Sequence, residues 1–141
     1  MKQEDKDLLL KDLCGRLPYG VKVKYAIPTL LVSVKNPTLL VSVRNDSDGI
    51  KVITEDTYIK YIYNIEDIKP YLRPMESMTD EEEKEYINID NRSYTCPMIY
   101  AHIPALERID WLNAHHFDYR GLIEKGLALE APEGMYNHYK E

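Results

Sequence analysis

The chain has 141 residues, a net charge of −6 and a hydrophobic content of 44%, which fits one domain of ordinary globular composition. Its longest apolar run is far shorter than the roughly 20 residues that cross a bilayer, and its charged first seven residues lack the pattern of a secretory signal. The two cysteines, Cys14 and Cys96, indicate reduced thiols rather than a disulfide framework. We therefore expect a cytoplasmic protein.

The first predicted element is a helix over residues 3–14, where leucines recur at helical spacing and Gly15 is placed to end the helix. A strand over residues 21–27 follows. In this strand apolar residues alternate with Lys22 and Lys24, which predicts one buried and one wet face.

Residues 28–45 contain one nine-residue sequence written twice, with a single Lys-to-Arg difference between the copies. Each copy has the composition of a strand, so we expect strands over residues 29–35 and 38–44, with Leu39 and Val43 on the same face. Because the copies are alike, their pairing register is weakly specified. We therefore expect that this segment can support a homo-oligomer by pairing along an exposed edge.

Closely spaced strand and turn signals continue to residue 74. An Asp-Gly pair at 48–49 marks a hairpin turn before a strand at 50–54. The strand predicted at 57–65 is apolar on both faces, which is typical of a central strand. A helical turn within 65–71 and a short strand at 72–74 follow. This spacing favours a small, strongly bent antiparallel sheet, and an SH3-like barrel fits the order of elements.

The chain becomes acidic after residue 75, and residues 76–141 hold more than half of all the acidic side chains. Thr79 and Glu82 form a capping box that predicts a helix start. We interpret the surrounding acids as the first turn of that helix, because its dipole favours negative charge there.

A second C-terminal helix is expected to begin at Pro104. Its predicted buried stripe consists of Leu106, Ile109 and Leu112. Asp118 is then expected to cap a short helix over residues 119–125, and residues 132–141 are expected to fray.

These elements predict an α+β protein. Residues 1–75 would form an N-terminal helix with a small barrel-like antiparallel sheet. Residues 76–141 would form an acidic helical segment that packs on this sheet, so that the two parts make one structural unit.

The sequence contains no strong metal or cofactor motif. His115 and His116 are adjacent, and neighbouring positions on a helix point about 100° apart, so the two rings are poorly placed to bind one ion. Paired-cysteine motifs, the His-Glu-x-x-His pattern and glycine-rich phosphate loops are all missing from the sequence. We expect no metal and no cofactor.

The sequence gives little support for a catalytic site. Cys96 lies six residues before His102, but a Cys–His pair also needs contact geometry and an oxyanion hole. A hydrolase that uses Cys96 or the His115–His116 pair is kept as a remote alternative. The expectation is a non-enzyme with no catalytic residue.

Three stretches, LCGRLPYGV at 13–21, DIKPYLRPM at 67–75 and the segment 110–131, resemble a group of small uncharacterised proteins of gut-bacterial prophage-like or mobile elements. The resemblance covers most of the chain, and the duplicated strand departs from it. It implies a cytoplasmic, phage-related setting and no catalytic residue.

The first functional hypothesis is an accessory module that binds an unknown protein partner. Tyrosine suits contact surfaces because its ring packs while its hydroxyl stays wet, and the chain has twelve tyrosines. Tyr58, Trp111 and Tyr119 are the candidate contact residues.

The alternative hypothesis is a small nucleic-acid-binding barrel. Lys22, Lys24 and Lys60 are its candidate contacts, and a patch with Arg16 is conceivable, although the negative net charge counts against it. The two hypotheses differ in one structural requirement. Nucleic-acid binding requires that the basic residues of the strands share one face, namely Lys22, Lys24, Lys35, Arg44 and Lys60.

Overall fold

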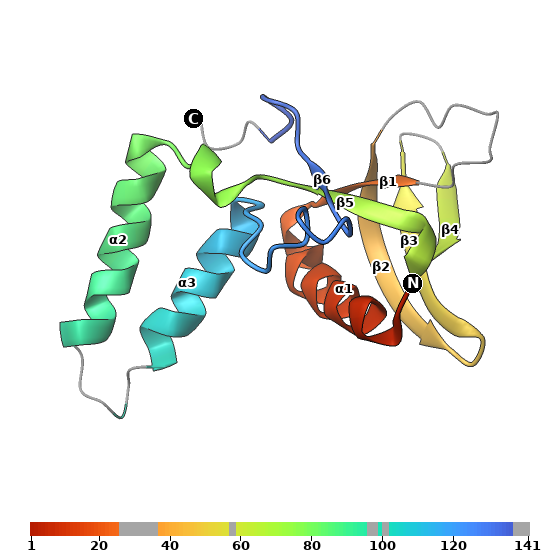
Figure 1. Ribbon diagram of the computed structural model, residues 1–141, viewed down its shortest axis with the longest axis horizontal. Helices are drawn as coiled ribbons and strands as arrows, with labels where there is room; N and C mark the ends of the chain where they lie inside the picture. The colour runs from red at the N-terminus through yellow and green to blue at the C-terminus, as the bar shows by residue number, and fades with distance from the viewer. Residues whose placement is uncertain (26–36, 57–58, 96–98, 100–101, 137–141) are drawn as a thin grey trace.

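The computed structural model describes residues 1–25, 37–56, 59–95, 99 and 102–136, and confirms the α+β class (Figure 1). Its helices are α1 (Gln3–Arg16), α2 (Asp80–Thr95) and α3 (His102–Ala114). Its strands are β1 (Lys22–Tyr25), β2 (Thr38–Asp46), β3 (Gly49–Glu55), β4 (Lys60–Asn64), β5 (Ile68–Leu72) and β6 (Leu129–Glu130). The expected strand at 29–35, Lys35, Tyr58 and Cys96 lie outside the described residues.

The strands form one six-stranded sheet in the order β4-β3-β2-β1-β5-β6, antiparallel except for the β5–β6 pair. Among the described strands this sheet is strongly curved but open, with β4 and β6 at its edges, so they do not close into a barrel. The strand expected at the centre is therefore the edge strand β4. Its outward apolar residues are exposed, as Ile62 shows with 60% of its surface accessible.

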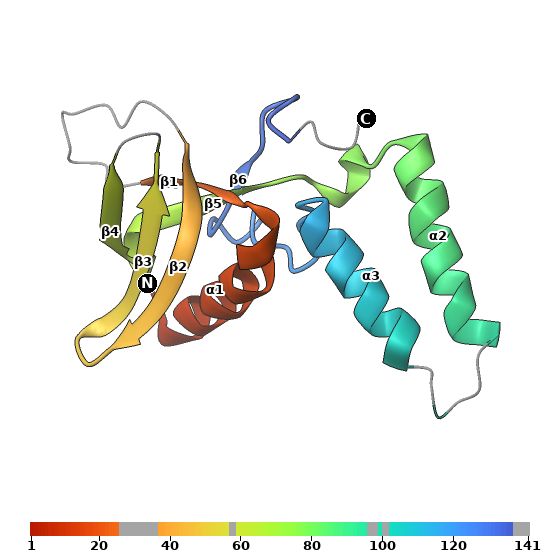
Figure 2. The ribbon, with the colours of Figure 1, turned by 180° about the vertical axis from the view of Figure 1, so that it is seen from behind.

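Helix α1 packs across one face of the sheet, as the views from the front and from behind agree (Figures 1 and 2). Its leucine stripe is confirmed, since Leu9 and Leu13 are fully buried. The strands and the residues next to them contribute most of the aliphatic core around them. These residues are Val21, Val23, Leu40, Val52, Ile65, Ile68 and Leu72. We call α1 and the sheet the body.

Gly15 lies within α1 rather than at its end. The helix continues to Arg16, and a Cβ atom at Gly15 would lie 3.2 Å from Nδ2 of Asn113 on α3. The glycine therefore permits the close approach of two helices. The left-handed residue that follows the helical segment is Gly20, with φ of 74°.

A β-bulge changes which residues of β2 face the core. Thr38 and Leu40 point toward α1, and the register then shifts between Leu40 and Ser42. After the shift Val43 pairs with the buried Val52. Leu39 therefore lies on the outer face and Val43 on the inner one, contrary to the expectation that they share a face. The bulge absorbs the extra residue in an apolar run that does not alternate.

The segment after α3 returns to the body. Asp118 accepts hydrogen bonds from the backbone N–H groups of Leu122 and Ile123, at 2.8 and 3.0 Å. It caps a series of turns and not the predicted regular helix. Leu122 then packs into the core.

The expected fraying does not begin at residue 132, because Tyr136 is only 4% exposed. Its hydroxyl accepts from the Lys22 backbone N–H at 2.9 Å and donates to the Tyr71 carbonyl at 2.8 Å. This hydroxyl therefore links the backbones of β1 and β5 just beyond the last residues at which these two strands pair.

Helices α2 and α3 form an antiparallel pair that projects from the body, which we call the arm (Figure 1). The predicted stripe of α3 is wrong for two of its three residues. Leu112 is buried, but Leu106 and Ile109 are 58% and 42% exposed, because α3 approaches α1 only near its C-terminal end, at Asn113. Within the described residues, no helix is long and apolar enough to cross a membrane.

Candidate interaction surfaces

The face of the sheet opposite α1, here called the outer face, follows from strand register and the alternation of side chains. Direct neighbours across strands on this face are Lys24 and Lys69, Lys22 and Leu39, Arg44 and Lys51, Ile53 and Ile62, and Glu55 and Lys60. Lys24, Arg44, Lys60, Leu39 and Ile62 are all exposed. Lys22 is half-buried, and its Nζ donates to the Met135 carbonyl at 3.3 Å. The described residues therefore leave the rest of this face accessible.

The outer face is basic although the whole chain is acidic. The four described bases that the nucleic-acid hypothesis requires to be together, Lys22, Lys24, Arg44 and Lys60, do share it. Lys24 and Lys69 stand directly opposite each other, and such a like-charged pair is destabilising in the free protein. A ligand of negative charge would relieve this repulsion.

Some of these charges have acidic neighbours. Arg44 lies 3.0 Å from Asp46, Lys51 lies 3.5 Å from Asp48, and Lys60 lies 3.8 Å from Glu55. Exposed pairs of this kind contribute about 0–1 kcal/mol each. They are weak enough to rearrange when a partner binds.

Aliphatic side chains lie on the outer face of β2, β3 and the edge strand β4. Ile53 and Ile62 are cross-strand partners, and Leu39 on β2 is 38% exposed. The basic residues lie around them. The face thus combines an apolar patch with neighbouring basic residues.

The tyrosines of the sheet mostly lie on the inner face. Tyr25 and Tyr63 stack with ring centroids 4.3 Å apart, and Tyr61 lies 6.0 Å from Tyr63. Burial raises the pKa of Tyr63, which agrees with its half-buried place beside the core. Tyr71 on β5 is the described tyrosine that alternation puts on the outer face.

The arm is joined to the body by a buried ion pair. Arg73 donates from both terminal nitrogens to Glu82, each at 2.7 Å, and its guanidinium lies 4.2 Å from the centre of the Phe117 ring. Burial alone would raise the pKa of Glu82, but hydrogen bonds from Arg73 and Thr79 outweigh it and lower the pKa to about 2.

Glu82 has a second contact that its sequence pattern did predict. Its carboxylate accepts from the Thr79 N–H at 3.0 Å, and its own N–H donates to the Thr79 hydroxyl at 3.2 Å. The capping box is thereby confirmed. The partner Arg73 was missed, because no local pattern links it to a helix that begins seven residues later.

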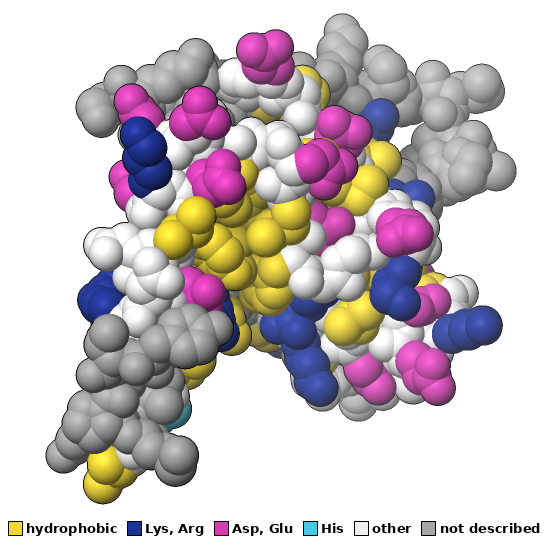
Figure 3. Space-filling model, turned by 60° about the vertical axis from the view of Figure 1, so that its left-hand side comes forward, with side chains coloured by type: hydrophobic (Ala, Val, Ile, Leu, Met, Phe, Trp, Pro, Cys, Tyr) yellow, Lys and Arg dark blue, Asp and Glu magenta, His cyan; other side chains and the backbone are white. Residues whose placement is uncertain are grey.

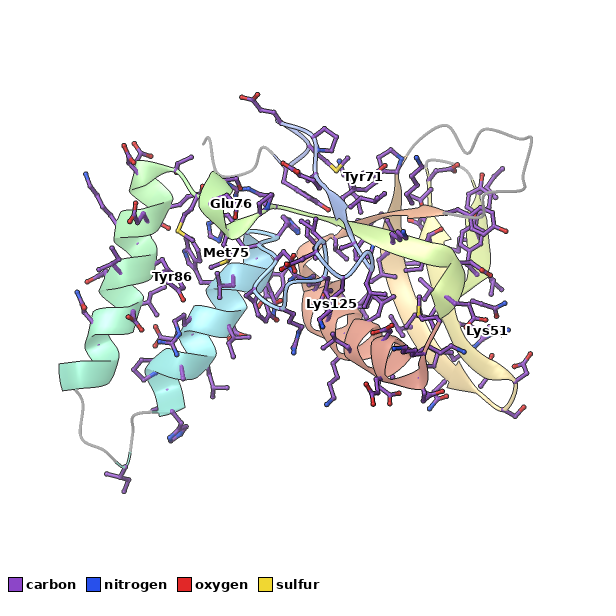
Figure 4. All side chains as sticks on the ribbon, viewed as in Figure 1. Lys51, Tyr71, Met75, Glu76, Tyr86 and Lys125 are labelled. Carbon is purple, nitrogen blue, oxygen red and sulfur yellow. The ribbon has the colours of Figure 1, made fainter. Side chains whose placement is uncertain are left out.

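Trp111 and Tyr119 are both held by neighbours at the base of the arm. Trp111 stacks on His115 at 4.0 Å and donates to Glu85 at 3.1 Å, and Tyr86 points toward it from α2 (Figure 4). Tyr119 donates to Asn113 at 2.8 Å. Both residues are half-buried and have packing or hydrogen-bond partners within the protein.

Arg16, which was placed in a conceivable basic patch, is fully buried and takes no part in one. It donates to Asp12 at 2.7 and 3.1 Å and to the Phe117 carbonyl at 2.7 Å. Arg120 approaches the same Asp12 carboxylate at 3.3 Å. This network ties α1 to the segment that follows the arm.

The two adjacent histidines face different neighbours. His116 is buried and stacks on Tyr136 at 3.7 Å, while His115 stacks on Trp111. Among the described residues no group of three His, Cys, Asp or Glu side chains could hold a metal ion. His115 and His116 therefore have packing contacts that account for their positions.

A cavity of about 340 Å³ lies between residues 73–79 and 130–136. Its lining combines Arg73, Thr79 and Tyr136 with Glu130 and Glu133. Arg73 is already bound to Glu82, and the described lining contains no Cys or His beside a nucleophile. This arrangement offers no assembled pair for nucleophilic catalysis.

The arm side of the molecule has a different surface character from the outer face of the sheet. Hydrophobic side chains form a continuous area there, and acidic side chains border it (Figure 3). Lys51 on the sheet and Tyr86 on the arm mark opposite ends of the molecule (Figure 4). The two surfaces are therefore well separated.

No family model, curated protein or solved structure matches this chain.

Proposed function

We propose that the protein is a non-enzymatic binding module that holds an acidic protein partner on the outer face of its sheet. The observation that carries the proposal is the combination on one face of an aliphatic patch, Ile53 and Ile62, with basic residues that include Lys24 and Lys69. An accessory role in a cytoplasmic, phage-related setting is part of the same proposal.

The apolar and basic residues of this face correspond to the two parts of a typical protein–protein interface. Protein interfaces have a desolvated apolar centre and a polar rim, and the energy is concentrated in the centre. Charges at the rim mainly speed association and select partners of opposite sign. Burying Ile62 would supply affinity, while the lysines would favour an acidic partner.

Single-stranded nucleic acid is the second candidate, because the basic residues of the strands share one face. Such ligands bind by stacking on aromatic rings as well as by charge. Tyr25, Tyr61 and Tyr63 lie on the inner face, and the outer face carries an aliphatic patch and, among the described sheet tyrosines, Tyr71 alone. This distribution favours a protein partner over a nucleic acid.

The test is capture of bound material from host lysate with and without nuclease, using wild type, Ile62→Glu and the control Ile87→Glu. Ile87 is 46% exposed on α2, outside the sheet. We expect a nuclease-resistant protein that Ile62→Glu loses and Ile87→Glu retains. Loss of all material after nuclease would favour the nucleic-acid candidate, and retention by Ile62→Glu would rule out the outer face.

A further inference from the structure

Helix α3 presents a row of residues along its exposed side, composed of His102, Ile103, Leu106, Ile109 and Asp110. The three aliphatic members are 45%, 58% and 42% exposed in chain order. At 3.6 residues per turn, all five residues lie within about 120° of the helix circumference. We call this set the α3 row.

The other charges of α3 are directed away from the row. Glu107 forms an ion pair with Arg92 at 2.7 Å, and Arg108 pairs with Asp90, so both contacts tie α3 to α2. The row itself is aliphatic in the middle and has one polar residue at each end. An aliphatic row of this kind, on a helix that ion pairs hold against its neighbour, is a candidate interaction site.

The α3 row is symmetric in sequence about Leu106. Ile103 and Ile109 lie three residues on either side of it, and His102 and Asp110 lie four residues on either side. A surface with this symmetry is complementary to itself when a second copy approaches in the antiparallel direction. Two-fold contacts between identical subunits have this property.

We propose that the α3 row binds a second copy of this chain through an antiparallel α3–α3 contact. At the centre Leu106 would meet the partner's Leu106. At each end His102 and Ile103 of one copy would meet Ile109 and Asp110 of the other. The isoleucines and leucines would form one continuous apolar seam.

Charge selects this arrangement over a parallel one. The antiparallel contact brings Asp110 to the end of the other helix that carries His102 and the positive end of the helix dipole. A parallel contact would place Asp110 next to its own copy, where like charges repel. The polar ends of the row therefore specify direction, and its aliphatic middle supplies the binding energy.

This interface lies outside the outer face of the sheet and does not involve the duplicated segment 28–45. A dimer formed through the arms would carry two outer faces. Binding of a partner with two matching sites would then be strengthened by effective concentration. The inference does not depend on the proposed function.

The test is the mass of the full chain in sedimentation or light scattering over a wide range of protein concentration. We expect wild type and Ile62→Glu to reach twice the chain mass of 16.5 kDa. Leu106→Glu should stay at the single mass, and circular dichroism would verify its fold. A wild-type chain that remains monomeric, or a dimer that Leu106→Glu does not disturb, would overturn the proposal.

A cross-linking experiment tests the geometry separately. In a background with Cys14→Ser and Cys96→Ser, Leu106→Cys should form a disulfide-linked dimer under mild oxidation, because the two-fold axis passes beside this position. Ile87→Cys serves as the control and should remain monomeric. The direction of the helices is tested by His102→Asp, which should weaken dimerisation, and by the exchange His102→Asp with Asp110→His, which should restore it. Equal cross-linking of both cysteine variants would contradict the seam.

Discussion

The body and the base of the arm are each stabilised by a different kind of interaction. In the body, Leu9 and Leu13 of α1 pack against an aliphatic sheet face. At the base of the arm, the contacts are the Arg73–Glu82 ion pair and the rings around Trp111. Aliphatic burial is non-directional, whereas a bidentate ion pair admits one geometry. The comparison indicates that the body is stabilised mainly by area and that the arm is oriented by specific polar contacts.

The largest effect is expected from removing one partner of the buried pair. Arg73→Ala leaves the Glu82 carboxylate buried without its cation, which costs about 3–5 kcal/mol. The loss should appear in the fluorescence of Trp111, the single tryptophan of the chain, during denaturant unfolding. The matched double variant Arg73→Met with Glu82→Leu should recover most of the stability, since an apolar pair also fills the site. If the double variant does not recover stability, the geometry of the Arg73–Glu82 ion pair, and not the cost of burying an unpaired charge, accounts for the loss.

The same pair predicts a pH dependence. Because the folded-state pKa of Glu82 is lowered from 4.5 to about 2, its stabilisation is present above pH 4.5 and is lost as the pH falls toward about 2. Trp111 fluorescence should report the weakening of the arm in this window. The double variant without Glu82 should lack this part of the acid transition, and an unchanged transition would assign it to other carboxylates.

Leu13→Ala tests the body side of the comparison. The side chain is fully buried in the aliphatic core, so its truncation should lower the free energy of unfolding by about 2–5 kcal/mol. Circular dichroism and Trp111 fluorescence should then shift together if body and arm unfold as one unit. Ile87→Ala is the control, because this isoleucine is 46% exposed on α2 and its truncation should change stability by about 0.5 kcal/mol or less.

Tyr136→Phe tests a polar contact that the C-terminal segment makes with the body. It removes the hydroxyl that bridges the Lys22 N–H and the Tyr71 carbonyl, at a cost of about 1–3 kcal/mol. Burial raises the pKa of Tyr136 to about 12. The wild type should therefore lose stability as the pH rises from 10 to about 12, and Tyr136→Phe should show a smaller loss over that range. Identical alkaline profiles would contradict the role of the hydroxyl.

Features that depend on a few neighbouring residues were predictable. The leucines of α1, the Asp-Gly turn before β3 and the capping box of Thr79 and Glu82 all appear as expected. Their physical causes lie within a few residues, in helical spacing, turn geometry and orphan N–H groups. The basic residues of the strands were likewise identified as candidates, and register then placed the described ones on one face.

Features that depend on what packs against an element were not predictable. The apolar strand β4 lies at an edge, and Leu106 and Ile109 of α3 are exposed. The spacing of Leu106, Ile109 and Leu112 is the same whether a helix is covered along its length or only at one end.

The sequence by itself determined the class of the protein, most helix and strand positions, and the acidic character of its C-terminal half. Only the tertiary structure decided which apolar faces are covered, that Arg16 and Arg73 are buried partners of Asp12 and Glu82, and that the sheet stays open. The reason is that propensity and capping act through adjacent residues, whereas burial is set by the surface that another segment happens to bring.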